Sequence, residues 1–369
     1  PPKPHGCVRA RFEIHDDIPE RYKVGLFAHA GTYDALIRFS NGPQRTDRDQ
    51  GAQGMAVKLL GVPGRKILDN QSDAETHDFI MIDGPVFFVR DTDSYARLVG
   101  ELALAPDDPP RKWEAWVEAQ HPGDLAVVKA YQARNADSPL TRPYFSQVPY
   151  RFGQGSDTIC RYSVVPHPDN MTIPIGQEER GPDFLRQAMV NQLVLSGRPA
   201  TFDFCLQLLE HATPQDIDNP TVEWTTPVQR VATITIPPQD FNRPEQDRLG
   251  ESLSYTPWHA LPDHRPVGQI NEVRRTVYAL SSRVRHFFRL TAEREPTSPF
   301  PQKPAGRAPR VAVLAATAAA VVVAAALGIV AWLTHIALPT YPAPDRQVWM
   351  DQGWQAGGRE WYHHASQGL

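Results

Sequence analysis

Cysteine is scarce in this chain, which has only 3 among its 369 residues: Cys7, Cys160 and Cys205. So few and so widely spaced cysteines exclude a disulfide scaffold and a cysteine-based zinc site. A basic excess is also lacking, because 38 Lys and Arg stand against 42 Asp and Glu, for a formal net charge of −4. We therefore expect no nucleic-acid partner, since binding to a phosphate backbone requires a surplus of cations.

Several catalytic signatures are missing as well. The chain has no Gly-x-Ser-x-Gly elbow, no Gly-x-x-x-x-Gly-Lys loop and no His-Glu-x-x-His pair. These absences argue against the common hydrolase, nucleotide-binding and zinc-protease designs. Proline, by contrast, is abundant at 36 residues. That abundance favours loops and sheet edges and disfavours a bundle of long helices.

One long apolar run is present near the end of the chain. Residues 311–333 carry no charge, and as a helix they would span about 35 Å, enough for a hydrocarbon core of roughly 30 Å. The run predicts one transmembrane helix over 311–334, with a buried alanine-rich core helix as the alternative. Arginines gather before the run, and the next cation after it is Arg346. The positive-inside rule then predicts residues 1–310 in the cytoplasm and the tail 335–369 outside.

The first 290 residues predict an α+β fold with an antiparallel β-barrel, followed by a Pro/Arg-rich linker over 291–310. Short apolar or alternating segments between turn residues indicate strands at Cys7–Ile14, Tyr33–Phe39, Gly54–Leu60, Phe79–Met81, Val86–Val89, Cys160–Val165 and Val231–Ile236. Helical spacing of apolar residues indicates helices at Thr92–Leu104, Trp113–Ala130 and Ile270–Leu290.

Two strand-like segments carry candidate functional residues. Arg38 interrupts an apolar strand, and a guanidinium there requires an anionic partner. That partner is either a bound anion or a structural carboxylate such as Asp47 or Asp49. Phe87 and Phe88 are adjacent, so in a strand they would face opposite sides. One of them would then line a pocket, unless both simply pack in the core.

The last predicted helix carries a third candidate. Arg274 and Tyr278 are four residues apart and therefore neighbours on one helix face. A guanidinium beside a phenol favours the phenolate form, which is a hard anionic ligand suited to ferric haem. The alternative is an ordinary amphipathic helix with a surface arginine.

Together these segments resemble the haem catalase family, and the short bacterial catalase-like haem proteins in particular, over about residues 1–290. The matching motifs keep the family's order: Arg38-Phe39-Ser40, then Arg48-Asp49 with Gly54-Met55-Ala56-Val57-Lys58, then Pro85-Val86-Phe87-Phe88-Val89-Arg90-Asp91, then Pro257-Trp258-His259 with Pro262-Asp263-His264-Arg265-Pro266, and finally Arg274 with Tyr278. The resemblance implies haem b as cofactor and peroxide as substrate.

The resemblance also implies a role for each matched residue. Tyr278 would be the metal ligand as a phenolate, since tyrosine is the axial ligand of catalase haem. Arg274 would keep that phenolate ionised, and Arg38 would pair with a haem propionate. Phe87 would pack near the haem face, and Ser40 would lie beside the distal histidine.

Two positions depart from the family pattern. The distal histidine is either His5 or a residue before Pro1, because the family's His-x-Lys spacing, counted from Lys3, falls on Pro1. The distal asparagine position is taken by Ile82, with Asp83 next to it. An ionised carboxylate only accepts hydrogen bonds, whereas asparagine can also donate one to bound peroxide. We therefore expect a membrane-anchored peroxidase that reduces hydrogen peroxide or organic and lipid hydroperoxides more slowly than a catalase.

Two further hypotheses stay open. The altered distal residues favour the first of these, a haem-binding or electron-transfer module without peroxide turnover. The second is a barrel without haem that serves as a scaffold or lipid binder. The segment 358–368 faintly resembles the opening of a di-haem cytochrome c peroxidase-like domain. It suggests a cytochrome c-type redox partner or a further domain, with a short solvated tail as the alternative.

Overall fold

The computed structural model describes residues 3–104, 111–170, 175–289 and 295–300. They belong to one compact unit, Pro1–Pro304, while a second unit, Ala305–Leu369, lies outside the described residues. The predicted transmembrane segment 311–334 and the tail 335–369 therefore also lie outside them. None of the helices within the described ranges combines the length and apolar character that a bilayer crossing requires.

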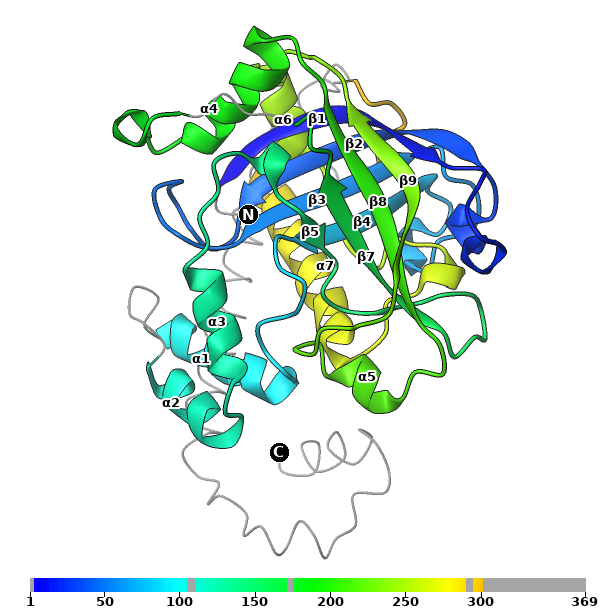
Figure 1. The fold of residues 1–369 in the computed structure, drawn as a ribbon, viewed down its shortest axis with the longest axis vertical. Coiled ribbons are helices and arrows are strands. Elements are labelled where there is room, and N and C mark those ends of the chain that lie inside the picture. The colour runs from blue at the N-terminus through cyan, green and yellow to red at the C-terminus, as the bar shows by residue number, and fades with distance from the viewer. Residues whose placement is uncertain (1–2, 105–110, 171–174, 290–294, 301–369) are drawn as a thin grey trace, which may run out of the picture. The chain divides into compact units, whose positions relative to one another are not determined.

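The unit is built on one antiparallel sheet of nine strands, shown in Figure 1. The strands are β1 (Pro4–Ile14), β2 (Gly31–Asn41), β3 (Gln53–Leu60), β4 (Thr76–Ile82), β5 (Tyr144–Phe145), β6 (Tyr150–Arg151), β7 (Ile159–Pro166), β8 (Ala200–Leu209) and β9 (Val228–Ile236). Their order is β5-β4-β3-β2-β1-β9-β8-β7-β6, and β5 also pairs with β7. That extra pairing closes eight of the strands into the predicted barrel and leaves β6 outside the ring.

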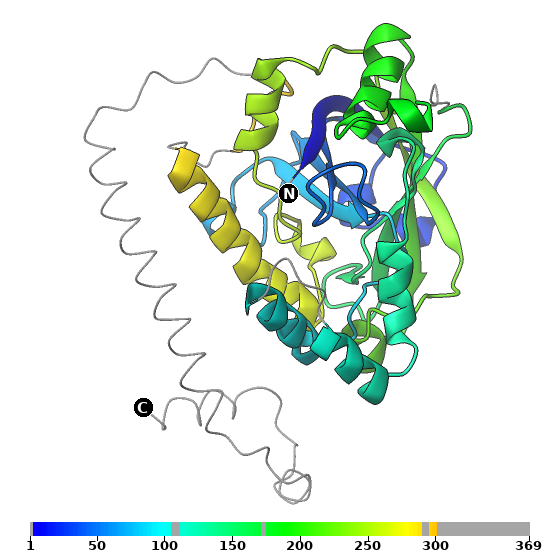
Figure 2. The same ribbon diagram turned by 90° about the vertical axis from the view of Figure 1, so that its left-hand side faces the viewer.

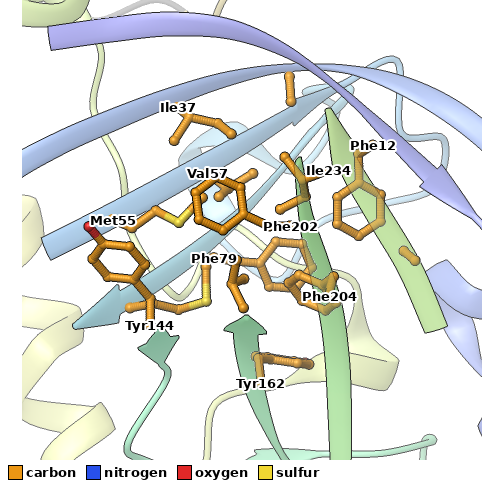
Figure 3. Close-up of a cluster of buried hydrophobic side chains, with 14 of the residues drawn as sticks. Phe12, Ile37, Met55, Val57, Phe79, Tyr144, Tyr162, Phe202, Phe204 and Ile234 are labelled. Carbon is orange, nitrogen blue, oxygen red and sulfur yellow. The ribbon is translucent and has the colours of Figure 1, made fainter. Parts of the chain in front are cut away.

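Alternation along the strands places apolar side chains inside the barrel. Phe12, Val57, Phe79, Phe204 and Ile234 point toward one another in the interior, as Figure 3 shows, and all are fully or almost fully buried. The rings of Phe79 and Phe204 lie 4.8 Å apart between centroids. The barrel interior is thus a packed hydrophobic core, and any ligand site must lie outside it.

The helices lie outside the barrel (Figures 1 and 2). They are α1 (Thr92–Leu104), α2 (Arg111–Gln120), α3 (Asp124–Gln132), α4 (Phe184–Val190), α5 (Pro214–Asp218), α6 (Pro244–Ser252) and α7 (Gln269–Arg289). The single helix predicted over Trp113–Ala130 is wrong, because the chain turns at Gly123, whose φ of 100° is unfavourable for other residues. The preceding Pro122 also disfavours continuation of α2.

One further prediction is wrong. Residues 86–89 do not form a strand, since β4 ends at Ile82 and the Phe87 amide donates to the carbonyl of Pro220 at 3.0 Å. Pro85 has no amide hydrogen to contribute to a ladder, which favours this irregular path. Strand β8, which the sequence analysis did not anticipate, pairs along its length with β7 and β9.

Candidate active site

A cavity of about 430 Å³ opens between the outer face of the barrel and helix α7. One wall of the cavity is formed by outward-facing residues of the sheet. Among them, Arg38 of β2, Ala56 of β3 and Ile80 of β4 form one row across the strands. The opposite wall of the cavity includes Arg274, Val277 and Tyr278 of α7. Helix α7 runs along the outside of the barrel in both ribbon views, Figures 1 and 2.

The charge of the cavity wall has one sign. Three guanidinium groups, those of Arg38, Arg274 and Arg285, are among the residues that line it. Within the described part of the chain, the lining contains no aspartate, glutamate or histidine. Apolar side chains such as Ile80, Ile82 and Val277 form much of the remaining surface. The cavity is therefore suited to a largely apolar ligand that carries negative charge.

Tyr278 and Arg274 lie together on α7, as their spacing predicts. Arg274 Nη2 is 3.4 Å from Tyr278 Oη, and the guanidinium lies 5.3 Å from the centre of the tyrosine ring. Arg274 Nη1 also donates to Asn271 Oδ1 at 3.1 Å. Burial opposes the charge of Arg274, but the interactions with Tyr278 and Tyr150 outweigh it, and the pKa of Arg274 is raised.

Arg38 does not form the structural ion pair that was its alternative role. Its Nη1 donates weakly to the carbonyls of Gly250 and Leu253 at 3.3 and 3.4 Å, and its guanidinium lies 4.5 Å from the ring centre of Tyr255. Among the described residues, no ion pair joins Arg38 to a carboxylate, and Asp47 instead pairs with Lys3 at 3.2 Å. The positive charge of Arg38 thus borders the cavity without a carboxylate partner there.

Phe87 and Phe88 both line the cavity. Their ring centroids are 4.6 Å apart, so the two side chains do not face opposite sides as a strand would require. The prediction that only one of them reaches a pocket is therefore wrong, and the reason is the irregular backbone after Pro85. Ser40 also lines the cavity, on the same outer face of β2 as Arg38.

His5 lies one layer behind the cavity wall. It is the extra residue of a bulge in β1, between the register pairs of Pro4 and Gly6, and its side chain is fully buried. Its Nε2 lies 3.1 Å from Asn41 Oδ1 and 2.9 Å from Gln53 Oε1. Asn41 lines the cavity, whereas His5 is not among the lining residues. Burial lowers the pKa of His5 although Asp47 acts in the opposite direction.

Asp83 is likewise absent from the cavity lining, while its neighbour Ile82 belongs to it. The carboxylate of Asp83 is buried: Oδ1 accepts from the backbone amide of Gln53 at 2.9 Å, and Oδ2 pairs with Arg142 Nη2 at 2.7 Å. Asp83 thus joins the start of β3 to the segment before β5. The structure brings five predicted site residues to one cavity, namely Arg38, Ser40, Phe87, Arg274 and Tyr278.

Sequence reasoning missed Arg285 and Ser254, which both line the cavity. Arg285 Nη2 donates to Ser254 Oγ at 2.9 Å. Arg285 follows Tyr278 by seven residues, which places it two turns further along the same face of α7. That spacing was the available signal for Arg285, but Ser254 comes from an irregular segment that no periodicity marks.

Comparisons with known proteins agree with this architecture. A fungal catalase superimposes with a TM-score of 0.59 at 16% identity, covering 77% of this chain and 58% of the catalase. Catalase A of Saccharomyces cerevisiae gives a TM-score of 0.59 at 17% identity, with 82% and 64% covered. A bacterial catalase gives 0.56 at 16% identity, with 76% and 57% covered. This chain thus spans about three fifths of the length of these catalases.

The sequence comparisons are sparser. No model of a known protein family matches the chain. An uncharacterised protein of Sinorhizobium fredii is 44% identical over 48 residues, which are 13% of this chain and 8% of that protein. The barrel with its outer helices, together with the structural neighbours, shows that this chain has a catalase-like fold.

Proposed function

We propose that this chain binds haem b in the cavity between the barrel and α7 and acts as a haem-dependent peroxidase. One observation carries the proposal: residues far apart in the sequence, from Arg38 to Tyr278, line the same cavity of about 430 Å³. They are the residues to which the resemblance with haem catalases assigns cofactor contacts. The catalase-like fold is consistent with this assignment.

The cavity fits a haem in size and in chemistry. Its volume lies in the range of about 300–1,000 Å³ that is usual for cofactor and ligand pockets. A haem is a planar apolar ring with two carboxylates, and the wall offers apolar side chains together with three guanidiniums and no carboxylate among the described lining residues. Val277 is 50% exposed although it faces the cavity, so a bound ring would cover apolar surface that now meets solvent.

The proposal assigns a role to the tyrosine and to the three arginines that line the cavity. The Tyr278 oxygen would bind the iron, and Arg274 would stabilise the phenolate, because Arg274 has no carboxylate ion pair within the described residues. Arg38 and Arg285 would bind the propionates through charge-assisted hydrogen bonds. When bound, the haem supplies a ferric iron that can exchange electrons with a peroxide.

The described wall of the cavity offers no evident general acid or base for proton transfer. No imidazole or carboxylate lies on the described wall of the cavity, and His5 is separated from it by Asn41. General acid–base catalysis requires a group within hydrogen-bond reach of the reacting oxygen or linked to it by water. We therefore infer slow turnover, and the apolar wall favours organic or lipid hydroperoxides over hydrogen peroxide. The same observation favours a second candidate function, a haem-binding or electron-transfer module without peroxide turnover.

The test is reconstitution of the full chain with haemin, followed by assays with hydrogen peroxide and with an organic hydroperoxide. The proposal predicts haemin uptake and donor-dependent consumption of the organic hydroperoxide, with little oxygen evolution from hydrogen peroxide. Among the described residues, His5 reaches the cavity wall only through its contact with Asn41, so His5→Gln should lower the slow turnover further without affecting haemin uptake, and the exposed His29→Gln is the matched control. Haemin uptake without any turnover would favour the second candidate, and failure to take up haemin would refute both.

The membrane location and the redox partner remain proposals of their own. We propose that residues 311–334 anchor the protein as a single pass in the lipid bilayer, with the catalase-like domain in the cytoplasm and residues 335–369 outside. The uncharged run and the arginines before it support this topology. We also propose a cytochrome c-type redox partner or domain at the tail, which in this topology would lie across the bilayer from the catalase-like domain. Carbonate washing of membranes should leave the full chain in the pellet, and its release would contradict the anchor.

A further inference from the structure

A second polar cluster lies on the same outer face of the barrel as the cavity. Lys58 of β3 and Asp78 of β4 are register partners, and both side chains are fully buried. Lys58 Nζ is 2.6 Å from Asp78 Oδ1. The pair occupies the row of residues next to Arg38, Ala56 and Ile80. By itself this buried pair would carry no net charge, because one ammonium neutralises one carboxylate.

A third charged group joins the pair from the segment beyond α7. Residues 295–300, which we call the strap, form the short orange segment in Figure 1. Glu295 Oε2 lies 2.6 Å from Lys58 Nζ and accepts from Thr76 Oγ1 at 2.8 Å, and only 11% of its side chain is exposed. At the other end of the strap, the ring of Phe300 lies 4.7 Å from the guanidinium of Arg9.

Within the described part of the chain, the cluster therefore holds two carboxylates for one ammonium. His259, whose Nδ1 is 3.4 Å from Glu295, adds no charge, because burial and the nearby Lys58 and Lys66 lower its pKa to about 2. Two buried carboxylates that share a single cation repel each other. Burial, with Glu295 adding to it, raises the pKa of Asp78 to about 7 against the opposing effect of Lys58.

The cluster also borders the cavity. Tyr255 lines the cavity, and its ring centre is 4.5 Å from the Arg38 guanidinium and 5.4 Å from Lys58 Nζ. The strap follows α7, which carries Arg274 and Tyr278 on the opposite wall. Docking of Glu295 thus holds the strap against β3 and β4, two of the strands that form the other side of the cavity.

We propose that the buried pocket of Lys58 and Thr76 is a pH-controlled docking site for the strap. When Asp78 is protonated, Glu295 is the one ionised carboxylate among the described residues that pairs with Lys58, and the strap is bound. When Asp78 is ionised, it competes for Lys58 and repels Glu295, and the strap is released. Among the described residues, the other groups that face this site are the neutral His259, the phenol of Tyr255 and the more distant Lys66, and none of these three supplies a competing anion.

Fluorescence anisotropy of a dye on the strap tests the proposal in the full chain. Ser298→Cys provides the attachment point. The dye should label this cysteine selectively, because Cys7, Cys160 and Cys205 are all buried. We expect high anisotropy at pH 6 and lower anisotropy at pH 8, with a midpoint near the Asp78 pKa of about 7. Asp78→Asn should keep the strap bound at both pH values, and Glu295→Ala should leave it released at both.

Two outcomes would overturn the proposal. One is an anisotropy that does not change between pH 6 and pH 8 in the otherwise native chain, and the other is an Asp78→Asn variant that keeps the full pH response. Thr76→Val gives an independent check should Asp78→Asn fail to fold. It removes the hydroxyl that donates to Glu295 and that also lies 3.2 Å from His259 Nδ1, so it should lower the anisotropy at pH 6. An unchanged value would contradict the docking role of Lys58 and Thr76.

Discussion

Replacement of Asp83 by asparagine tests whether this carboxylate serves the fold or the chemistry. Its Oδ1 accepts from the Gln53 amide at 2.9 Å, and its Oδ2 pairs with Arg142 at 2.7 Å. An asparagine oxygen can retain the first contact, but its amide group would face the guanidinium donor to donor. Breaking a buried ion pair from one side costs about 3–5 kcal/mol. Because the Arg142 side chain is 23% exposed and can be partly solvated, we expect Asp83→Asn to lose roughly 2–4 kcal/mol of unfolding free energy.

Equilibrium urea unfolding at pH 7 measures this loss. Asp157→Asn is the matched control, since Asp157 pairs with His211 on the exposed surface, and its replacement should change stability little. Asp83 does not line the cavity, so peroxide turnover per bound haem should not rise in Asp83→Asn. A variant as stable as the native chain with faster turnover would refute this reasoning and would place the carboxylate beside bound peroxide.

The remaining predictions concern two other buried side chains. Asn271→Ala removes the acceptor of Arg274 Nη1 and the donor to the carbonyls of Pro149 and Val267, so it should cost about 1–3 kcal/mol and weaken haemin binding in a titration. Unchanged affinity would show that Arg274 needs no support from Asn271. Burial lowers the pKa of His264 to about 4, so below pH 6.5 the unfolded chain binds a proton that the folded chain does not. His264 should therefore lower the free energy of unfolding by roughly 3 kcal/mol as the pH falls from 6.5 to 4. In urea unfolding, the free energy of unfolding of His264→Gln should depend less steeply on pH over that interval. An identical slope in the variant would contradict this assignment.

The barrel was predictable because its strands follow simple rules. Alternation and β-branched composition located most strands, and β1 and β2 extend only a few residues beyond the predicted Cys7–Ile14 and Tyr33–Phe39. Helix α1 has the predicted bounds Thr92–Leu104. Strand β8 was not predicted, although buried and less buried residues alternate along most of it. The irregular path after Pro85 could not be predicted locally, because it depends on a hydrogen bond to Pro220, which is distant in sequence.

The site was predictable only in part, for a related reason. The pair of Arg274 and Tyr278 follows from helix geometry, which is local. The ion pair of Asp83 with Arg142 and the docking of Glu295 on Lys58 join residues that no local pattern connects. Helix α7 also departs from the expected amphipathic packing, because Val277 and Leu280 of its apolar face are 50% and 61% exposed. Apolar residues at helical spacing predicted burial, but here they border a cavity and the molecular surface.

The absorption spectrum of the haemin-reconstituted full chain, recorded beside that of Tyr278→Phe, tests the central claim most directly. The substitution removes only the hydroxyl that would bind iron and keeps the ring that lies beside the Arg274 guanidinium. The account predicts a Soret band with a phenolate-to-iron signature in the native chain, and loss or shift of that signature in the variant. Identical spectra from the two proteins, or a chain that stays colourless with haemin, would contradict it.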